Sequence, residues 1–152
     1  MKEVIAKEMI FLHRNFTSQE EVFRFLARQL AAAGRGGQEE ALVEGFYARE
    51  KEFSTALNDR LAIPHCKSRA VKEATVLVVC NEREISWTDG EPVDLLFALM
   101  IPAEDENRLH IRILAQVAQL MMEESFIEAV RQGQDAREIY NAMKDLNALQ
   151  ND

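Results

Sequence analysis

Two long apolar stretches near the middle of the chain restrict its fold more than any other feature. Residues 74–80 and 93–101 are rich in Val and Leu and do not alternate between apolar and polar side chains. A strand of that kind needs cover on both faces, so the stretches predict two central strands of a buried sheet. Residues 81–92 between them carry charges, Trp87 and the pair Asp89-Gly90. They predict a loop or a hairpin whose Trp87 covers the edge of the core.

Helical patterns lie on both sides of these strands. Ser18 and Glu21 form a capping box ahead of an apolar pattern of helical period that ends at Gly34. Similar patterns predict helices over residues 38–50, from residue 107 onward, up to Gly133 and over residues 135–149, and a short first strand is expected at residues 8–12. Because helices precede and follow the strands, the expected fold class is α/β (α+β), a sheet covered on both faces by helices. We expect a single domain over residues 1–152.

One histidine stands at a position that the local sequence defines. Residues 61–63 form a short apolar strand, and Pro64 restricts its own backbone and that of Ile63 before His65 follows. The imidazole is therefore expected to project from a strand end, a common place for a reactive group. The same observation fits a structural or surface histidine.

Two further residues have both a functional and a structural interpretation. Arg49 lies in the last turn of the helix predicted over residues 38–50, where a cation complements the helix dipole whether or not it meets a ligand. His110 lies in the first turn of the helix predicted from residue 107, where free N–H groups favour an anion and keep an adjacent imidazole neutral. His110 fits equally well as the end of that helix's apolar stripe.

Charge and composition exclude several classes of protein. The net charge of −8 opposes binding to a phosphate backbone, so no nucleic-acid partner is expected. It favours basic partners, and it is explained equally well by an acidic surface that aids solubility. The longest apolar run, residues 95–101, is far shorter than the roughly 20 residues of a membrane-spanning helix. Cys66 and Cys80 lack metal-type spacing and no signal segment begins the chain, so we expect a reduced, cytoplasmic protein.

The sequence contains no recognisable cofactor or metal motif. It has no Gly-x-Ser-x-Gly elbow and no phosphate-binding Gly-x-x-x-x-Gly-Lys-Ser/Thr loop, and its histidines lack zinc-type spacing, so no cofactor and no metal are expected. Cys66 directly follows His65, so the two side chains point to opposite faces of an extended segment and do not form a dyad. A histidine acting by itself remains. Its neutral imidazole has a lone pair that attacks phosphorus and later releases the phosphoryl group, whose oxygens nearby cations hold.

A set of short segments is more specific in combination than any one of them. These are Arg49-Glu50, Ser54-Thr55, Leu61-Ala62-Ile63-Pro64-His65-Cys66-Lys67-Ser68, Ile85-Ser86-Trp87, Gly90-x-Pro92-Val93-Asp94-Leu95-Leu96-Phe97 and Leu109-His110. Together they resemble enzyme IIA of the bacterial sugar phosphotransferase system, fructose/mannitol type (type 2), over essentially the whole chain. The resemblance implies a three-layer α/β/α sandwich with a mixed central sheet.

The resemblance also implies a reaction and its partners. His65 corresponds to the phosphoacceptor, which takes a phosphoryl group from the phosphocarrier protein HPr and passes it to a cysteine of enzyme IIB. Membrane enzyme IIC is then an indirect partner. His110 corresponds to the family's second active-site histidine, and Arg49 to the arginine beside the phosphorylated one. The implied activity is that of a phosphotransferase component with a phosphohistidine intermediate.

Two other roles compete with sugar transport. One is that of a regulatory, nitrogen-type protein that controls other proteins through the same phosphohistidine. The other is an interaction module that kept only the fold, and the joint presence of His65, His110 and Arg49 argues against it.

The chain departs from the resemblance in one segment. Ala56, Asn58 and Arg60 stand where family members commonly have glycines. Asn58 tolerates a left-handed conformation better than most residues, whereas Arg60 is either a phosphate contact or a solvated loop charge. Glu50 and Glu52 lie in the segment that leads to His65, so Glu→Gln changes there are expected to weaken the salt dependence of phosphorylation by a basic HPr more than a change at distant Glu138.

Overall fold

The computed structural model describes residues 3–105, 108–133 and 135–151. Its strands are β1 (Ile10–Arg14), β2 (Leu61–Ala62), β3 (His65–Ser68), β4 (Thr75–Ser86) and β5 (Pro92–Pro102). Its α-helices are α1 (Gln19–Ala32), α2 (Glu39–Glu52), α3 (Leu109–Met121), α4 (Glu124–Gln132) and α5 (Ala136–Met143). Short 3₁₀ segments cover Lys7–Met9, Asn58–Arg60, Thr88–Gly90 and Lys144–Asn151. No helix among the described residues is long and apolar enough to cross a membrane.

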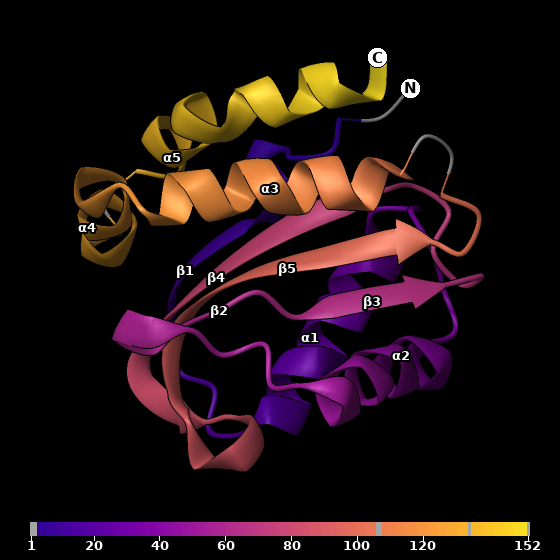
Figure 1. The fold of residues 1–152 in the computed structure, drawn as a ribbon, viewed down its shortest axis with the longest axis horizontal. Coiled ribbons are helices and arrows are strands. Elements are labelled where there is room, and N and C mark those ends of the chain that lie inside the picture. Colours follow the sequence, from indigo (N-terminus) through magenta and orange to yellow (C-terminus); the bar gives the residue numbers. More distant parts are fainter. Residues whose placement is uncertain (1–2, 106–107, 134, 152) are drawn as a thin grey trace.

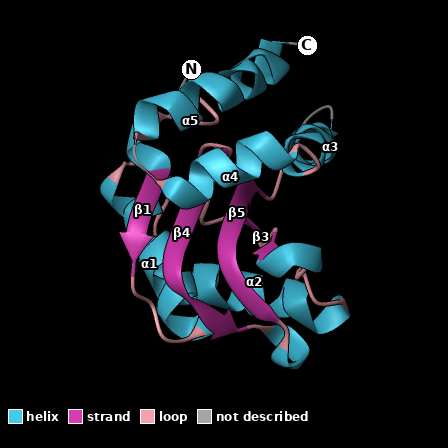
Figure 2. Ribbon diagram, turned by 90° about the vertical axis from the view of Figure 1, so that its left-hand side faces the viewer, coloured by secondary structure: helices cyan, strands magenta, loops and turns pink. Residues whose placement is uncertain are grey.

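The strands form one mixed sheet in the order β1-β4-β5-β2, with β3 also paired to β5. Strands β4 and β5 are antiparallel, whereas β1 runs parallel to β4, and both β2 and β3 run parallel to β5. The two apolar stretches thus form the two central strands, as their composition predicts. Helices α1 and α2 lie on one face of the sheet, and α3, α4 and α5 lie on the other (Figures 1 and 2). The expected three-layer sandwich with a mixed sheet is confirmed.

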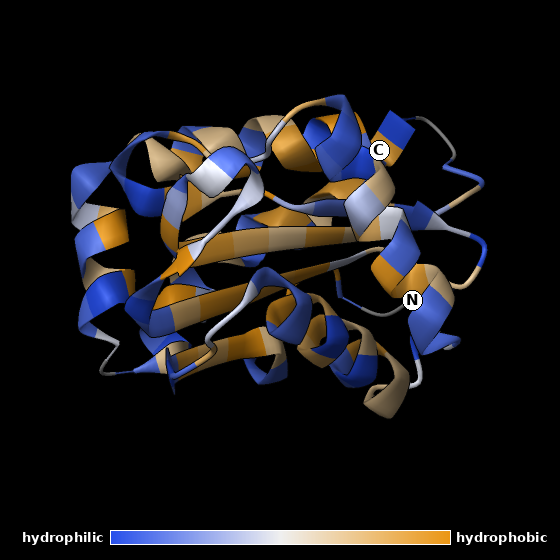
Figure 3. Ribbon diagram, turned by 90° about the horizontal axis from the view of Figure 1, so that it is seen from below, coloured by the Kyte–Doolittle hydropathy of each residue, from blue (hydrophilic) through white to orange (hydrophobic). Residues whose placement is uncertain are grey.

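The helices owe their positions to amphipathic sequences. In Figure 3 the long strands are hydrophobic along most of their length, while the helices carry both hydrophobic and hydrophilic residues. Helix α1 buries Phe23, Leu26 and Leu30 completely on the face that meets the sheet and α2. Its start agrees with the predicted capping box, because the Glu21 N–H donates to the Ser18 hydroxyl at 3.1 Å.

Strand β4 extends further into the charged segment 81–92 than its sequence predicts. The segment 81–86, expected to lie outside the strands, belongs to β4, and the turn is confined to Thr88–Gly90. The pairing with β5 is irregular between Cys80 and Ile85, and beyond this bulge the charged side chains face solvent while Ile85 is buried. Trp87 is buried at this end of the core, as expected.

Pro64 divides a strand rather than ending it. Leu61 and Ala62 pair with β5, the chain passes through Ile63 and Pro64, and pairing resumes at His65 opposite Leu99. Proline fits because this is the edge of the sheet, and its carbonyl still accepts from the Leu99 N–H at 2.9 Å. His65 therefore begins a strand instead of projecting from the end of one. Helix α3 begins at Leu109, and the predicted start at Asn107 lies outside the described residues.

The segment without the family's glycines adopts the backbone that glycine would favour. Asp59 and Arg60 have φ values of 61° and 63°, in the left-handed region, whereas Asn58 does not. An ion pair at 2.8 Å joins Arg60 Nε to Asp94, and Arg131 donates both to Asp94, at 2.9 Å, and to the Asp59 carbonyl. Arg60 is thus a structural ion-pair partner rather than an unpaired loop charge.

Arg60→Gly is expected to be more stable than Arg60→Ala by about 1 kcal/mol, because only glycine adopts the left-handed conformation without steric cost. Both variants lose the ion pair to Asp94, so the difference between them isolates the backbone. Urea unfolding of the two variants measures it. An alanine variant as stable as the glycine variant would contradict the assigned strain.

Candidate functional site around His65

His65 and Cys66 face opposite sides of the sheet, as their adjacency predicts. The Cys66 thiol is fully buried under α2 and donates to the Leu42 carbonyl at 3.3 Å. His65 points to the other side, where His110 of α3 acts on it electrostatically. Burial raises the pKa of the Cys66 thiol to about 12, so it remains a protonated packing group.

The environment of His65 keeps its imidazole neutral. Burial first, then the positive charge of Arg49, then His110 lower its pKa to about 4. Both ring nitrogens are shielded from solvent, and neither has a hydrogen-bond partner in the described part of the chain. A neutral, unbonded imidazole retains one lone pair for attack on an electrophile. A reaction partner reaches that lone pair only after the ring or its neighbours shift.

Arg49 combines its structural and electrostatic interpretations. Its Nη1 donates to the Phe53 carbonyl at 2.8 Å, which closes the carboxyl end of α2. Its charge also acts on His65. The structure thus brings together the three residues that the sequence singled out.

Glu50, next to Arg49, is buried, so it does not present the exposed charge that the expected attraction of HPr requires. Only 5% of it is exposed. Its carboxylate accepts from the Thr55 N–H at 3.0 Å, from the Thr55 hydroxyl and from the Thr88 hydroxyl at 2.6 Å. The Thr55 hydroxyl in turn accepts from Trp87 Nε1 at 3.2 Å. These neutral donors replace the water that the buried charge loses, and they tie α2 to the β4–β5 turn.

The same network reaches the strand that carries His65. The Thr55 carbonyl accepts from the Ile63 N–H at 3.1 Å, two residues before His65. The last turn of α2 therefore fixes this strand from one side.

His110 has a partner that the sequence did not identify. One carboxylate oxygen of Asp105 accepts from the His110 backbone N–H at 3.1 Å and also contacts its ring Nδ1. The Asp105 side chain is only 4% exposed. The two residues are only five apart in the sequence, but the N-cap of α3 is Arg108, so the usual capping pattern does not single out Asp105. His110 is thus more than the end of an apolar stripe.

The approach of α2 to β3 depends on a glycine. A Cβ atom added to Gly45 would lie 2.7 Å from the Cys66 sulfur, closer than such atoms pack. Gly45 is one turn before Arg49 on α2, and Cys66 adjoins His65, so this contact sets how closely the two site elements approach.

The third histidine lies elsewhere. His13 Nδ1 is 2.9 Å from a Glu82 oxygen, and its Nε2 is 2.7 Å from the Gly133 carbonyl. Among the described residues, no group of three or more His, Cys, Asp or Glu side chains is placed to hold a metal ion.

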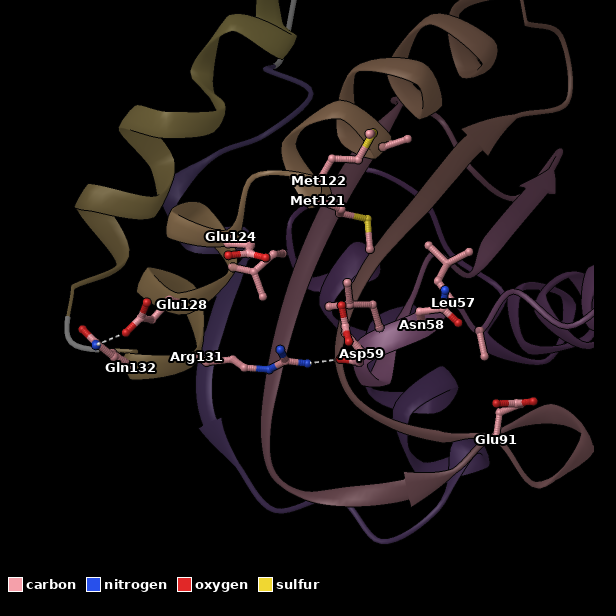
Figure 4. Close-up of a pocket in the computed structure, with 14 residues that line it drawn as sticks. Leu57, Asn58, Asp59, Glu91, Met121, Met122, Glu124, Glu128, Arg131 and Gln132 are labelled. Carbon is pink, nitrogen blue, oxygen red and sulfur yellow. Dashed lines mark hydrogen bonds between the residues drawn. The ribbon is translucent and has the colours of Figure 1, made fainter.

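An open groove of about 1140 Å³ lies between α3, α4 and the segment that leads into β2 (Figure 4). Its walls combine apolar side chains such as Leu57, Leu61 and Met121 with carboxylates of Asp59, Glu91, Glu124 and Glu128. Figure 4 shows Arg131 reaching toward Asp59 within it. His65 does not line the groove. Leu61 precedes it by four residues, about 13 Å along the sheet edge.

Comparison with known proteins finds several that resemble this chain. Residues 3–146 match the family described as phosphoenolpyruvate-dependent sugar phosphotransferase system, EIIA 2. A nitrogen regulatory protein of Bradyrhizobium diazoefficiens is 32% identical over 143 residues, which cover 93% of this chain and 92% of that protein. The 2-O-alpha-mannosyl-D-glycerate-specific EIIABC component of Escherichia coli is 31% identical over 147 residues, 95% of this chain. The chain spans only 22% of the length of that relative.

A solved structure is similar over almost the whole chain. The nitrogen regulatory protein IIA-Ntr from Neisseria meningitidis matches with a TM-score of 0.82 and 26% identity, covering 92% of this chain and 96% of that one.

The lowered pKa of His65 predicts a pH-dependent loss of stability. Because its folded-state pKa is about 4 and its ordinary value is 6.5, the folded protein binds fewer protons than the unfolded chain between these values. The contribution is full above the ordinary value and is lost as the pH falls toward the folded value. Between about pH 7.5 and pH 4.5 the wild type should lose about 2 kcal/mol more than His65→Gln. Urea unfolding of both proteins at the two pH values measures this difference. Equal losses would show that His65 titrates normally.

Proposed function

The chain belongs to the EIIA 2 family of the phosphoenolpyruvate-dependent sugar phosphotransferase system, and from this membership we propose that His65 carries a phosphoryl group between two proteins. The donor is phospho-HPr, and the acceptor is a cysteine of an enzyme IIB, with enzyme IIC acting after it. The observation that carries the assignment is the neutral His65 ring beside Arg49 and His110, with both nitrogens free of hydrogen bonds to the described residues.

Phosphoryl transfer through a histidine needs a nucleophilic ring nitrogen and nearby groups that bind the phosphoryl oxygens. A lone pair on a ring nitrogen of His65 attacks phosphorus, the new N–P bond forms, and the donor's imidazole leaves with the electrons of the old N–P bond. In the second step a thiolate of enzyme IIB attacks the same phosphorus and releases His65. Arg49 supplies a fixed positive charge for the phosphoryl oxygens, and His110 supplies a second hydrogen-bonding group.

Regulation through the same phosphohistidine is a second candidate. It is favoured by the similarity to IIA-Ntr at a TM-score of 0.82 and by the nitrogen regulatory relative that is matched over 92% of its length. The two roles share the loading step and differ in the next. Transfer of label onward to an enzyme IIB supports transport, whereas a loaded protein that no enzyme IIB discharges supports regulation.

The loading step tests the proposal directly. With phosphoenolpyruvate, enzyme I and HPr, the wild type should gain one acid-labile phosphate and His65→Ala none. His110→Ala should load on the order of 100-fold more slowly, the low end of the range for one positioned proton-transfer group. His13→Ala is the matched control, because His13 lies outside the site. Unchanged labelling of His65→Ala would defeat the assignment.

The carboxylates that line the groove between α3, α4 and the segment before β2 predict an electrostatic attraction of the phosphoryl donor. Glu124 and Glu138 are both exposed acids in the first turn of a helix, but only Glu124 lines the groove. If a basic donor surface is steered toward the groove, Glu124→Gln should lower the second-order loading rate on the order of twofold at low salt, and Glu138→Gln should not.

The difference should vanish as salt shortens the Debye length from roughly 30 Å at 0.01 M to about 8 Å at 0.15 M. Loading rates of the two variants that match at every salt concentration would assign no steering role to the groove.

A further inference from the structure

We infer that Asp105 is a positioning residue for His110, holding its imidazole in the form with the proton on Nδ1 and leaving Nε2 as the nitrogen that faces a phosphoryl group. The inference rests on the proposed function for the identity of that group. The placement of the proton rests on geometry alone.

A single oxygen of Asp105 makes both contacts. Its Oδ2 accepts from the His110 backbone N–H at 3.1 Å and contacts the ring Nδ1 of the same residue. An ionised carboxylate only accepts hydrogen bonds, so the nitrogen that it contacts must carry the proton. The neutral ring then has its lone pair on Nε2. The backbone contact fixes the carboxylate, and the carboxylate fixes the ring.

The contact between Asp105 and His110 Nδ1 is shielded from solvent, whereas part of the ring is exposed. The Asp105 side chain is 4% exposed, whereas that of His110 is 33% exposed, so the contact turns the shielded edge of the ring inward and leaves the rest accessible. The ionisable groups that the structure connects to the ring come from three elements: Asp105 before α3 contacts it, the neutral His65 on β3 interacts with it, and Arg49 on α2 acts on His65. Of these, Asp105 is the group in hydrogen-bonding contact with the His110 ring.

The arrangement suits a loaded His65. A dianionic phosphoryl group brings oxygens that only accept hydrogen bonds, so a His110 ring that meets one of them through Nε2 must carry a proton on that nitrogen as well. The resulting imidazolium keeps Nδ1–H against Asp105, so neither the ring nor the carboxylate needs to reorient. Removal of the carboxylate partner of a metal-bound histidine typically changes activity by about 10- to 100-fold, and we expect an effect at the lower end of this range for His110.

Two variants separate the ring contact from the carboxylate charge. The Asp105→Ser oxygen is one bond closer to the backbone and loses both contacts of Oδ2, while Asp105→Asn keeps an acceptor oxygen in place and loses only the charge. In ¹⁵N spectra of the histidine rings at about pH 8, the wild type and Asp105→Asn should show His110 protonated on Nδ1. Asp105→Ser should show Nε2 protonated in a large fraction of molecules. The His13 signals should be unchanged and serve as the internal control.

Loading of His65 by phospho-HPr provides the second measurement. Asp105→Ser should load on the order of tenfold more slowly than the wild type, whereas Asp105→Asn, which keeps the acceptor oxygen, should load at close to the wild-type rate. The same ring tautomer in Asp105→Ser as in the wild type would overturn the inference. So would a changed tautomer with an unchanged loading rate. Failure of the wild type to label at His65 would instead overturn the proposed function, because the ring spectra do not depend on phosphoryl transfer.

Discussion

Backbone pairing along β5 is the constraint on which the candidate site depends. Strand β3 begins at His65 opposite Leu99, and the Leu99 N–H donates to the carbonyl of Pro64 just before it. Strand β5 itself ends at Pro102, three residues before Asp105. One strand of a sheet buried on both faces thus determines where His65 lies and where the segment that holds His110 begins. A one-residue shift in the register of β3 would turn His65 toward the other face of the sheet.

The last turn of α2 contributes the rest of the site through two adjacent residues with opposite roles. Arg49 closes the helix and acts on His65, whereas Glu50 is buried and bound by hydroxyl and amide donors. A buried carboxylate is costly unless its oxygens are satisfied, so this network is a rigid feature rather than a source of surface charge. The network around Glu50 therefore fixes the helix turn from which Arg49 acts on His65.

The sequence was sufficient for features that depend on local or compositional physics. The apolar stretches predicted β4 and β5, the capping box at Ser18 predicted the start of α1, and family membership agrees with the resemblance read from the motifs. The roles of His65, Arg49 and His110 in a reaction remain predictions. Features set by distant partners could not be predicted. The bulge that extends β4 depends on pairing with β5, and the burial of Glu50 depends on hydroxyl groups from two other segments.

The close packing of Gly45 on Cys66 has a consequence beyond the helix that contains it. Helix α2 packs closely on β3 only because residue 45 has no side chain, so the distance between the two elements depends on the absence of a single methyl group. A larger residue at this position requires either the Cys66 side chain or the end of α2 to shift, and a shift of α2 would carry Arg49 with it. The effect of Arg49 on the pKa of His65 therefore depends on the volume of the side chains packed between α2 and β3. An uncharged substitution at this contact can alter the electrostatics of the site.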